Sequence, residues 1–316
     1  MDEMGLTMKK VNILMSIYKP NLNFLIKQLQ SINNQTYQNI EVLINDDCPD
    51  SPCEISVFKK YLTKVSYKIL SQDDHNLGYI KSFEKLLKNS DGDYIAFCDQ
   101  DDIWFSNKIE KSISVLEEKN ALLVASDRQI IDENDNVVSE SVRKKSNKIQ
   151  ENWHTGDDIA KYNLFITFAV GMVIVMKGEY ARSTLPFSRY TGHDKWVISC
   201  AATDGKVAFI EEPLVQYRRH GHNVSGVLVG IESKKDYMDQ RVIPDSNAIY
   251  DFLVKYPNFK DKKEVLAFSN ARMNHSIVQL FRYRYLAPDI ASFDIVISLT
   301  PGFMFPFLLK IARKFG

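Results

Sequence analysis

Short apolar runs alternate with helical patterns along the first half of the chain. Apolar and β-branched runs of about four to eight residues are typical of buried strands, and such strands are expected within residues 11–18, 39–45, 61–70, 94–98 and 121–125. Apolar residues at helical spacing follow in the intervals, at residues 22–32, 79–87 and 107–119. This alternation is typical of βαβ units, so we expect an α/β fold: a mainly parallel central sheet with helices on both faces.

The next part of the chain is less regular. Residues 132–150 are polar and charged and predict a mobile surface loop. Residues 164–176 are strongly apolar and β-prone. A helix is expected over residues 193–202, and a short strand over 206–210.

From about Gly230 the pattern is helical and the strand signals stop. We therefore expect an α/β domain over residues 1–228 and a helical C-terminal extension over residues 229–316. A chain of 316 residues is long enough to bury a large core in this arrangement.

Charge and cysteine content narrow the class of protein. The 40 basic and 40 acidic side chains cancel, which argues against a nucleic-acid partner. The four cysteines form no CxxC pair and indicate no disulfide framework. The N-terminus has no signal-peptide core, and no apolar run reaches the ~18 residues of a membrane span. We expect a soluble, cytoplasmic protein.

Three carboxylates directly follow the strand expected at residues 94–98. Asp99, Asp101 and Asp102 repel one another unless a cation or a set of hydrogen-bond donors holds them. Oxygen ligands suit Mg²⁺ or Mn²⁺, and such an ion can neutralise the diphosphate of a nucleotide. The alternative is a polar turn after a strand.

Polar residues also close the first two strands: Ser16 and Tyr18 after one, and Asp46 and Asp47 after the other. Ligands of open α/β sheets bind at the carboxyl ends of the strands. Tyr18 can stack on a base, and a carboxylate after the second strand can accept the N–H of a pyrimidine. Turn formation or helix capping is the alternative for the two aspartates.

Residues 217–226 form a second polar cluster, with cations, imidazoles, an amide and two glycines. This composition suits a loop that closes over a diphosphate, where Arg218 or Arg219 offsets phosphate charge. His220 can complete a metal sphere or bond a phosphate. A solvated basic loop is the alternative.

Five motifs occur in an order that resembles a family 2 inverting glycosyltransferase of the GT-A fold. They span residues 11 to about 226: the opening strand with Tyr18, INDD at 44–47, NLG at 76–78, DQDD at 99–102 and GHD at 192–194. The resemblance implies a nucleotide-sugar donor and a bound Mg²⁺ or Mn²⁺.

The resemblance also implies roles for single residues. It matches these residues to nucleoside, nucleotide and phosphate contacts: Ser16, Tyr18, Asp47, Asn76, Gly78 and Lys81. It matches Asp99 and Asp101 to the DxD pair, and Asp102 to the adjacent carboxylate. Which of Asp99, Asp101, Asp102 and His220 ligates the metal, and which holds ribose or sugar hydroxyls, stays open. For Lys81 a solvated helix position is the alternative.

The resemblance makes Asp194 the expected general base. One positioned carboxylate suffices to take the proton of an acceptor hydroxyl. His193 is expected to orient Asp194 or to contact the acceptor. The alternatives are a helix-cap residue for Asp194 and a solvent-facing side chain for His193.

Residues 76–84, 193–196, 212–215 and 217–223 resemble the bacterial rhamnosyltransferases that build cell-wall or capsular polysaccharide. This branch implies dTDP-L-rhamnose as donor, with a UDP-hexose or UDP-N-acetylhexosamine as the alternative. A nucleotidyltransferase is disfavoured because no glycine-rich loop follows the first strand. A non-catalytic, membrane-associated scaffold is the alternative of another class.

Residues 303–315 combine aromatic and aliphatic side chains with three cations and no acid. This pattern predicts a basic amphipathic helix that lies on an anionic membrane, peripheral to the inner face of the plasma membrane. A lipid-linked saccharide acceptor would suit such an anchor. The alternative is an apolar face that docks on the protein or on a second subunit of a homodimer.

Overall fold

The computed structural model describes residues 8–221 and 228–315. The contacts of the chain divide it into two compact units. The first contains residues 1–158, 168–187 and 193–220, and the second contains residues 159–167, 188–192 and 221–316. The first unit thus ends a few residues before the expected boundary at 228, and two short segments of the α/β region belong to the second unit.

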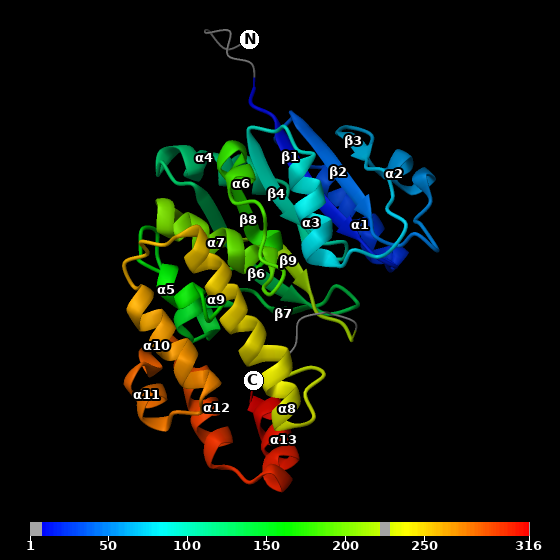
Figure 1. Cartoon of the computed structure of the whole chain (residues 1–316). Helices are drawn as coiled ribbons and strands as arrows, with labels where there is room; N and C mark the ends of the chain where they lie inside the picture. The colour runs from blue at the N-terminus through cyan, green and yellow to red at the C-terminus, as the bar shows by residue number, and fades with distance from the viewer. Residues whose placement is uncertain (1–7, 222–227, 316) are drawn as a thin grey trace. The chain divides into compact units, whose positions relative to one another are not determined.

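A nine-stranded sheet forms the centre of the first unit (Figure 1). Its strands are β1 (Val11–Ile17), β2 (Ile40–Asp46), β3 (Ser66–Ile69), β4 (Tyr94–Cys98), β5 (Ile103–Trp104), β6 (Leu123–Ile131), β7 (Val137–Ser139), β8 (Ile174–Lys177) and β9 (Val207–Arg218). The order across the described sheet is β3-β2-β1-β4-β8-β6-β9-β5, with β7 paired to β6.

The strands that begin the chain are parallel. β1 pairs in parallel with both β2 and β4, and β2 pairs in parallel with β3. Strands β1 and β4 are almost fully buried, as expected for a parallel sheet covered on both faces. β8 is antiparallel to β4 and β6, while β9 is parallel to β6. The predicted α/β class with a mixed, mainly parallel sheet is confirmed.

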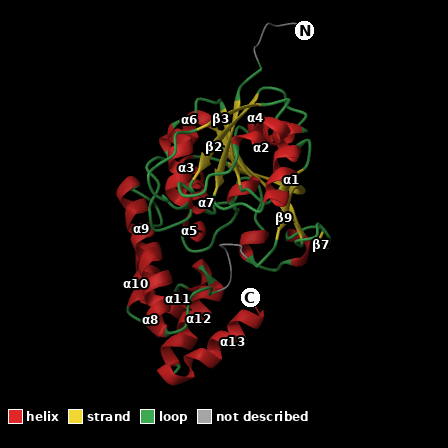
Figure 2. Ribbon diagram, turned by 90° about the vertical axis from the view of Figure 1, so that its right-hand side faces the viewer, coloured by secondary structure: helices red, strands yellow, loops and turns green. Residues whose placement is uncertain are grey.

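Helices cover both faces of this sheet, with α3 and α6 on one side and α1 and α4 on the other (Figure 2). The helices of the first unit are α1 (Leu22–Asn33), α2 (Ile55–Tyr61), α3 (Tyr79–Lys88), α4 (Lys108–Glu118), α6 (Gly178–Ser183) and α7 (His193–Asp204). Helix α1 begins after Asn21, whose side chain accepts hydrogen bonds from two backbone N–H groups of the first turn. Its buried face carries Leu25, Leu29 and Ile32, at the predicted helical spacing.

The apolar, β-prone run at residues 164–176 forms a strand only at its end. Only its end contributes to β8, and a single 3₁₀ turn precedes that strand. The start of the run belongs to the second unit, where Phe165 stacks edge-on against Phe268 with ring centroids 4.8 Å apart. The run is apolar throughout because its two ends enter different cores.

The predicted mobile loop at residues 132–150 is structured instead. Its first part is a turn in which the Asp132 carboxylate accepts hydrogen bonds from the backbone N–H groups of Asn134 and Asn136. Asp135 in this turn pairs with the buried Arg218. Strand β7 follows this turn. The ion pair between Asp135 and Arg218 thus holds a polar segment whose composition alone did not indicate an ordered structure.

The second unit is helical, as predicted for the end of the chain. Its helices are α5 (Ala160–Asn163), α8 (Lys234–Tyr237), a π-helical turn (Met238–Val242), α9 (Ile243–Lys255), α10 (Lys262–Met273), α11 (Ile277–Arg282), α12 (Pro288–Leu299) and α13 (Phe305–Phe315). The π-helical turn joins α8 to α9 where Pro244, at the start of α9, lacks the N–H that an α-helix would bond. Within the described residues, no helix has both the length and the apolar character to cross a membrane.

A buried ion network joins the helices of the second unit. Arg272 is 3% exposed, and its Nε donates to Asp294 Oδ2 at 2.8 Å while one terminal nitrogen donates to Asp245 Oδ2 at 2.8 Å. The Tyr237 hydroxyl donates to Asp294 Oδ1 at 2.7 Å. Four helical segments are therefore held together through Arg272, whose removal would leave the buried Asp294 carboxylate without its cation.

Candidate active site

The polar residues that close β1, β2 and β4 lie at one edge of the sheet. The parallel register aligns Ile17 with Asp46, and Met15 with Cys98. Ser16 and Tyr18, Asp46 and Asp47, and the DQDD motif therefore leave the sheet side by side. This edge is where open α/β sheets bind ligands.

Gln100 connects the first and third of these strand ends. Its Oε1 accepts a hydrogen bond from the Tyr18 backbone N–H at 2.9 Å, and its Nε2 donates to the Tyr18 carbonyl at 3.2 Å. Tyr18 is 46% exposed, so a face of its ring can receive a flat ligand. No role was predicted for Gln100 from the sequence. Its position between Asp99 and Asp101 is the only feature of the sequence that points to this bridging role.

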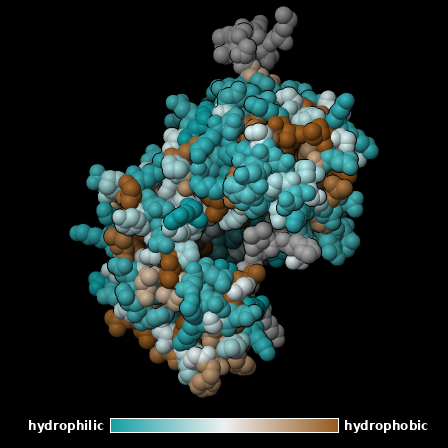
Figure 3. Space-filling view, turned by 45° about the vertical axis from the view of Figure 1, so that its right-hand side comes forward, coloured by the Kyte–Doolittle hydropathy of each residue, from teal (hydrophilic) through white to brown (hydrophobic). Residues whose placement is uncertain are grey.

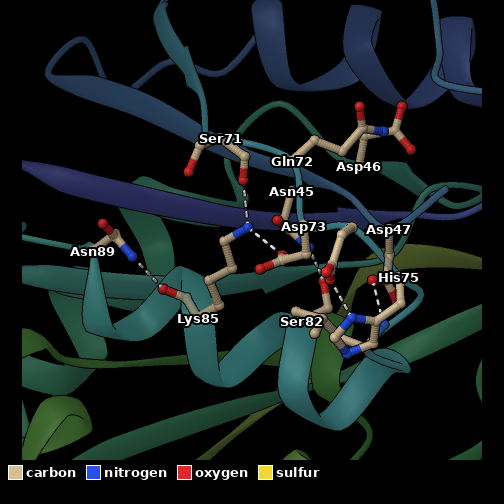
Figure 4. Close-up of polar contacts among 12 residues, drawn as sticks. Asn45, Asp46, Asp47, Ser71, Gln72, Asp73, His75, Ser82, Lys85 and Asn89 are labelled. Atoms are coloured by element: carbon tan, nitrogen blue, oxygen red, sulfur yellow. Dashed lines mark hydrogen bonds and ion pairs between the residues drawn. The ribbon is translucent and has the colours of Figure 1, made fainter. Parts of the chain in front are cut away.

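A short hydrogen-bond chain links β1, β2 and α3. Ser16 Oγ lies 2.7 Å from Ser82 Oγ, and Asn45 Nδ2 donates to Ser82 Oγ at 2.8 Å. Figure 4 shows Asn45 and Ser82 beside the loop that precedes α3. In the same view Lys85 holds that loop through the Ser71 carbonyl and the Asp73 carboxylate.

Asp47 acts on the protein's own backbone. Its Oδ1 accepts from Leu77 N at 2.8 Å, and its Oδ2 accepts from Gly78 N at 2.8 Å and Asn76 Nδ2 at 2.9 Å. The residue is 4% exposed, and these hydrogen bonds clamp the NLG loop, while the contact of Asp47 with a nucleoside stays a prediction. Gly78 has φ of +76°, which a glycine adopts without strain at the start of α3.

Lys81 lies on α3 with its side chain 48% exposed, and its Nζ pairs with Glu84 Oε2 at 3.1 Å. Lys88 pairs with the other oxygen of Glu84 at 2.6 Å. The Glu84 carboxylate is buried and is also paired with Lys88, so it keeps a cation if the half-exposed Lys81 turns toward an anion. The structure is compatible with both expectations for this residue.

The DQDD carboxylates raise one another's pKa. Burial, followed by the negative charges of Asp101 and Asp194, raises the pKa of Asp99 to about 7. Asp102 is fully buried, and burial together with Asp101 and Asp99 raises its pKa well above the usual range. Asp194 is distant in sequence, and its effect on Asp99 places it in the same electrostatic environment.

Arg218, for which a phosphate contact is predicted, is buried at the end of β9 and contacts groups of the protein. Its side chain is fully buried against the ring of Phe24, with the guanidinium carbon 4.4 Å from the ring centroid. Its Nε donates to the Asp101 carbonyl at 2.8 Å, and a terminal nitrogen donates to the Asp135 carboxylate at 2.5 Å. Its backbone N–H donates to Asp102 Oδ1 at 3.0 Å.

Arg219 and His220 follow Arg218 at the end of β9. Arg219 is exposed directly after β9, and its backbone N–H donates to the Ile131 carbonyl at 2.8 Å. His220 Nε2 lies 2.8 Å from Asp101 Oδ2. The remainder of the predicted loop, residues 222–226, lies outside the described residues.

The donor set fits a divalent cation in part. Asp99 and Asp101 supply carboxylate oxygens, and the raised pKa of Asp99 shows a concentration of negative charge that a cation would relieve. Asp102 is turned into the protein toward Arg218 N, and His220 is hydrogen-bonded to Asp101. In the part of the chain that the structure describes, no three acidic, histidine or cysteine side chains are already gathered as a metal site.

Asp194 lies in the first turn of α7, where its Oδ1 accepts a hydrogen bond from Lys195 N at 2.7 Å. Its charge also contributes to the raised pKa of Tyr79, behind burial as the larger cause. Asp194 is therefore a carboxylate at a helix N-terminus whose charge acts on both Asp99 and Tyr79.

His193 faces the core, so the solvent-facing alternative is wrong. The ring is 5% exposed and stacks on Phe83 at 4.0 Å between centroids, with Phe97 at 4.8 Å. A Cβ on Gly171 would lie 2.7 Å from His193 Nε2, so only glycine fits there. Burial lowers the pKa of His193 to about 4, which leaves a neutral ring at neutral pH.

Lys108, at the start of α4, is fully buried beneath the motif. Its Nζ lies 3.6 Å from the centroid of the Trp104 ring. Burial lowers the pKa of Lys108 to about 7, while the negative charge of Asp102 opposes that change. No sequence pattern indicated this residue, because a lysine at the start of a helix usually faces solvent.

The pKa of His193 predicts how stability depends on pH. Because the folded pKa is about 4 and an unfolded histidine has about 6.5, the unfolded state binds more protons between these values, and stability falls as the pH falls. We expect His193 to account for a loss of about 2.5 kcal/mol between pH 7 and pH 4.5. Urea unfolding of the wild type and His193→Leu across this range measures it.

His193→Leu should show a shallower pH profile than the wild type by that amount. His154→Leu, which removes a histidine with a 67% exposed side chain, is the matched control and should follow the wild type. Parallel profiles for the wild type and His193→Leu would contradict the buried, neutral imidazole.

Known proteins share both the sequence pattern and the fold. A family model described as Glycosyl transferase family 2 matches residues 13–172, which is 160 of the 316 residues. An uncharacterized glycosyltransferase of Methanocaldococcus jannaschii is 26% identical over 311 residues, covering 96% of this chain and 94% of that protein.

Two further proteins carry more specific descriptions. WfgD of Escherichia coli, a UDP-Glc:α-D-GlcNAc-diphosphoundecaprenol β-1,3-glucosyltransferase, is 32% identical over 38% of this chain and 48% of its own length. The structure of S. aureus TarS in complex with UDP-GlcNAc superposes with a TM-score of 0.58, covering 89% of this chain and 82% of that one. At 16% identity, that likeness shows the fold alone. With a family match over half of its length and the GT-A arrangement of its sheet, the chain belongs to glycosyl transferase family 2 and is a glycosyltransferase.

Proposed function

We propose that this protein transfers a sugar, with inversion, from a nucleoside diphosphate to a hydroxyl of a saccharide or lipid-linked saccharide. One observation carries the proposal. The parallel register brings the ends of β1, β2 and β4, and with them the DQDD carboxylates, to one edge of the sheet, and the contribution of Asp194 to the raised pKa of Asp99 supports Asp194 as a member of the same site. That site lies at the carboxyl edge of the parallel strands, where such a donor would bind.

In the proposed reaction the acceptor oxygen attacks the anomeric carbon from the face opposite the diphosphate. The bond from that carbon to the diphosphate oxygen breaks as the new glycosidic bond forms, and the hydroxyl proton passes to the Asp194 carboxylate. Lys195 N holds Asp194 Oδ1, which fixes the direction of the carboxylate. The neutral ring of His193 packs against Phe83 and Phe97 and sets the start of α7.

Tyr18, with its exposed ring, is proposed to stack on the base, and Ser16 and Asn76 to line the nucleoside side of the site. Gly78, Lys81, Arg219 and His220 are proposed to lie along the phosphates. Asp47 contributes by holding the NLG loop in place. This rigid framework supports binding because little order has to be created when the donor arrives.

Family 2 glycosyltransferases typically depend on a divalent metal. We propose Asp99 and Asp101 as its ligands here, with His220 and Asp102 as the flanking groups. When bound, Mg²⁺ or Mn²⁺ would supply positive charge to the leaving diphosphate.

For the donor we propose a UDP-hexose or UDP-N-acetylhexosamine. WfgD is described as using UDP-Glc, and TarS was solved with UDP-GlcNAc. The motif resemblance favours dTDP-L-rhamnose instead, but none of the three similar proteins above is described as a rhamnosyltransferase.

A non-catalytic scaffold is disfavoured because Asp99, Asp101 and Asp194 are all present in the chain. A role in bacterial capsule or cell-wall polysaccharide synthesis follows from the acceptor class.

Thermal unfolding with a panel of donors tests the class of substrate. We expect UDP-Glc or UDP-GlcNAc with Mn²⁺ to raise Tm by several degrees, because a ligand that binds only the folded state stabilises it. Stabilisation by dTDP-L-rhamnose alone would keep the mechanism and overturn the donor. No response to any nucleotide sugar, with or without Mn²⁺, would favour the scaffold.

Asp194→Asn removes the proposed base and changes little else. We expect the transfer rate to fall by about 10²–10⁴-fold, the usual contribution of a positioned base, while the Kd of the donor stays within a factor of about three. Release of nucleoside diphosphate and titration calorimetry measure the two quantities. Asp204→Asn, the same change at the exposed end of α7, is the matched control. Retained turnover in Asp194→Asn would exclude this residue as the base.

Asp101→Asn tests the metal. We expect the binding of Mn²⁺ in the presence of UDP to weaken by about 10-fold or more, because a hard cation loses a charged oxygen ligand. Calorimetric titration of Mn²⁺ measures this without any turnover. Asp91→Asn, an exposed aspartate just before β4 at the opposite edge of the sheet, serves as control. Unchanged Mn²⁺ affinity in Asp101→Asn, or full activity in EDTA, would sink the assignment.

A further inference from the structure

The last helix of the second unit has two apolar faces. Phe305 and Leu309 of α13 are 1% and 3% exposed and pack into one cluster with Ile231, Val242 and Ile297. Leu308 packs against the same cluster at its edge. This spacing is one face of a helix. The sequence allowed this segment either to bind a membrane or to dock on the protein. This face of α13 docks on the protein.

The opposite face is uncovered in the described residues. Phe303 is 84% exposed, Phe307 64%, Met304 45% and Ile311 43%. Phe303, Phe307 and Ile311 recur every four residues, so they lie on one side of the segment. Leu299, at the end of α12, is 68% exposed. Figure 3 shows brown and light-brown surface over the lower part of the second unit. We call these five residues, with Lys310, the terminal patch.

The charge around the terminal patch is positive. Residues 295–316 contain Lys310, Arg313 and Lys314 and no Asp or Glu. Lys310 is exposed and lies three residues after Phe307, on the same side of the helix. Arg313 is exposed as well, and its guanidinium donates to the carbonyls of Leu228 and Ile231, which fixes the helix on its unit.

We propose that the terminal patch is a membrane-docking surface for anionic phospholipid. Protruding phenylalanines can enter the boundary between headgroups and acyl chains, while the exposed Lys310 meets anionic headgroups. Helix α13 has 11 residues, or about 16 Å of rise against a hydrocarbon thickness of about 30 Å, so it would lie along the surface.

The positive charge of the terminal patch favours an anionic bilayer over a second copy of the chain as its partner. In a twofold dimer the same patch meets itself, so the cations of one copy would face those of the other with no acid from residues 295–316 between them. An anionic bilayer supplies the opposite charge to the same residues. The aromatic side chains alone would suit either partner.

The surface does not depend on the transferase chemistry. Its use in reaching a lipid-linked acceptor rests on the proposed function, but binding to a bilayer does not. A failure of vesicle binding and a failure of sugar transfer are therefore separate results.

Sedimentation of the full chain with vesicles tests the proposal. We expect binding to phosphatidylcholine vesicles that contain 30% phosphatidylglycerol, at least 10-fold weaker binding to pure phosphatidylcholine, and loss of binding as salt is raised from 0.1 to 0.5 M. The double variant Phe303→Ser/Phe307→Ser should bind at least 10-fold more weakly, and Lys310→Glu several-fold more weakly. Both phenylalanines are exposed, so the cluster around Phe305 is left intact.

A matched control alters two exposed apolar residues of another helix in the same unit. Tyr250→Ser/Val254→Ser on α9, where the side chains are 67% and 65% exposed, should bind vesicles like the wild type. Hydrolysis of the nucleotide sugar should be the same in all variants.

Three outcomes would overturn the proposal. The first is no binding to the anionic vesicles. The second is an equal loss in the α9 control, which would make the binding a general property of exposed apolar residues. The third is a concentration-dependent dimer, seen by sedimentation velocity, that Phe303→Ser/Phe307→Ser dissolves; the patch would then be an interface between two copies.

Discussion

The accumulation of negative charge at the end of β4 is the constraint on which the candidate site depends. Asp99, Asp101 and Asp102 follow one another at a buried strand end, and each raises the pKa of a neighbour. Two buried basic side chains lie beside these carboxylates. Arg218 holds Asp101 and Asp102 through main-chain contacts and pairs with Asp135, and Lys108 lies under the motif beside Trp104. In this framework burial and the charges of Asp101 and Asp194 raise the pKa of Asp99, and a divalent cation at this point would offset the negative charge of the carboxylates.

The second feature of the site is that its loops are fixed from within. Asp47 clamps the NLG segment, Gln100 joins the DQDD motif to the end of β1, and Ser82 gathers Ser16 and Asn45. These contacts come from β1, β2, β4 and α3, which the parallel register brings together. Polar residues that resemble ligand contacts in the sequence thus divide into those that hold the site and those that face its opening. Exposure separates the two groups: Tyr18 and Arg219 are exposed, whereas Asp47 and Arg218 are buried.

The second unit is built by different physics. Its helices are joined by the Arg272 network and by an apolar cluster that receives Phe305 and Leu309. Burying one face of α13 leaves its other aromatic side chains exposed, because a helix of that composition has more apolar surface than one contact can cover. A membrane surface would explain why residues 295–316 combine this excess with positive charge and no acid.

The sequence by itself determined the elements and the family. The strands near residues 11–18, 39–45 and 94–98 were predictable because buried parallel strands are continuous apolar runs, and the ordered motifs pointed to a glycosyltransferase. Tertiary structure decided the fate of single side chains. Arg218, His193 and Lys108 are polar residues, yet they are buried against Phe24, Phe83 and Trp104 respectively. Phe24 and Phe83 are far from their partners in the sequence, and no sequence pattern indicated that Trp104 would cover Lys108. The apolar run at 164–176 was ambiguous for the same reason. A hydrophobic pattern records that a residue is buried, but only the packed chain fixes which partner buries it.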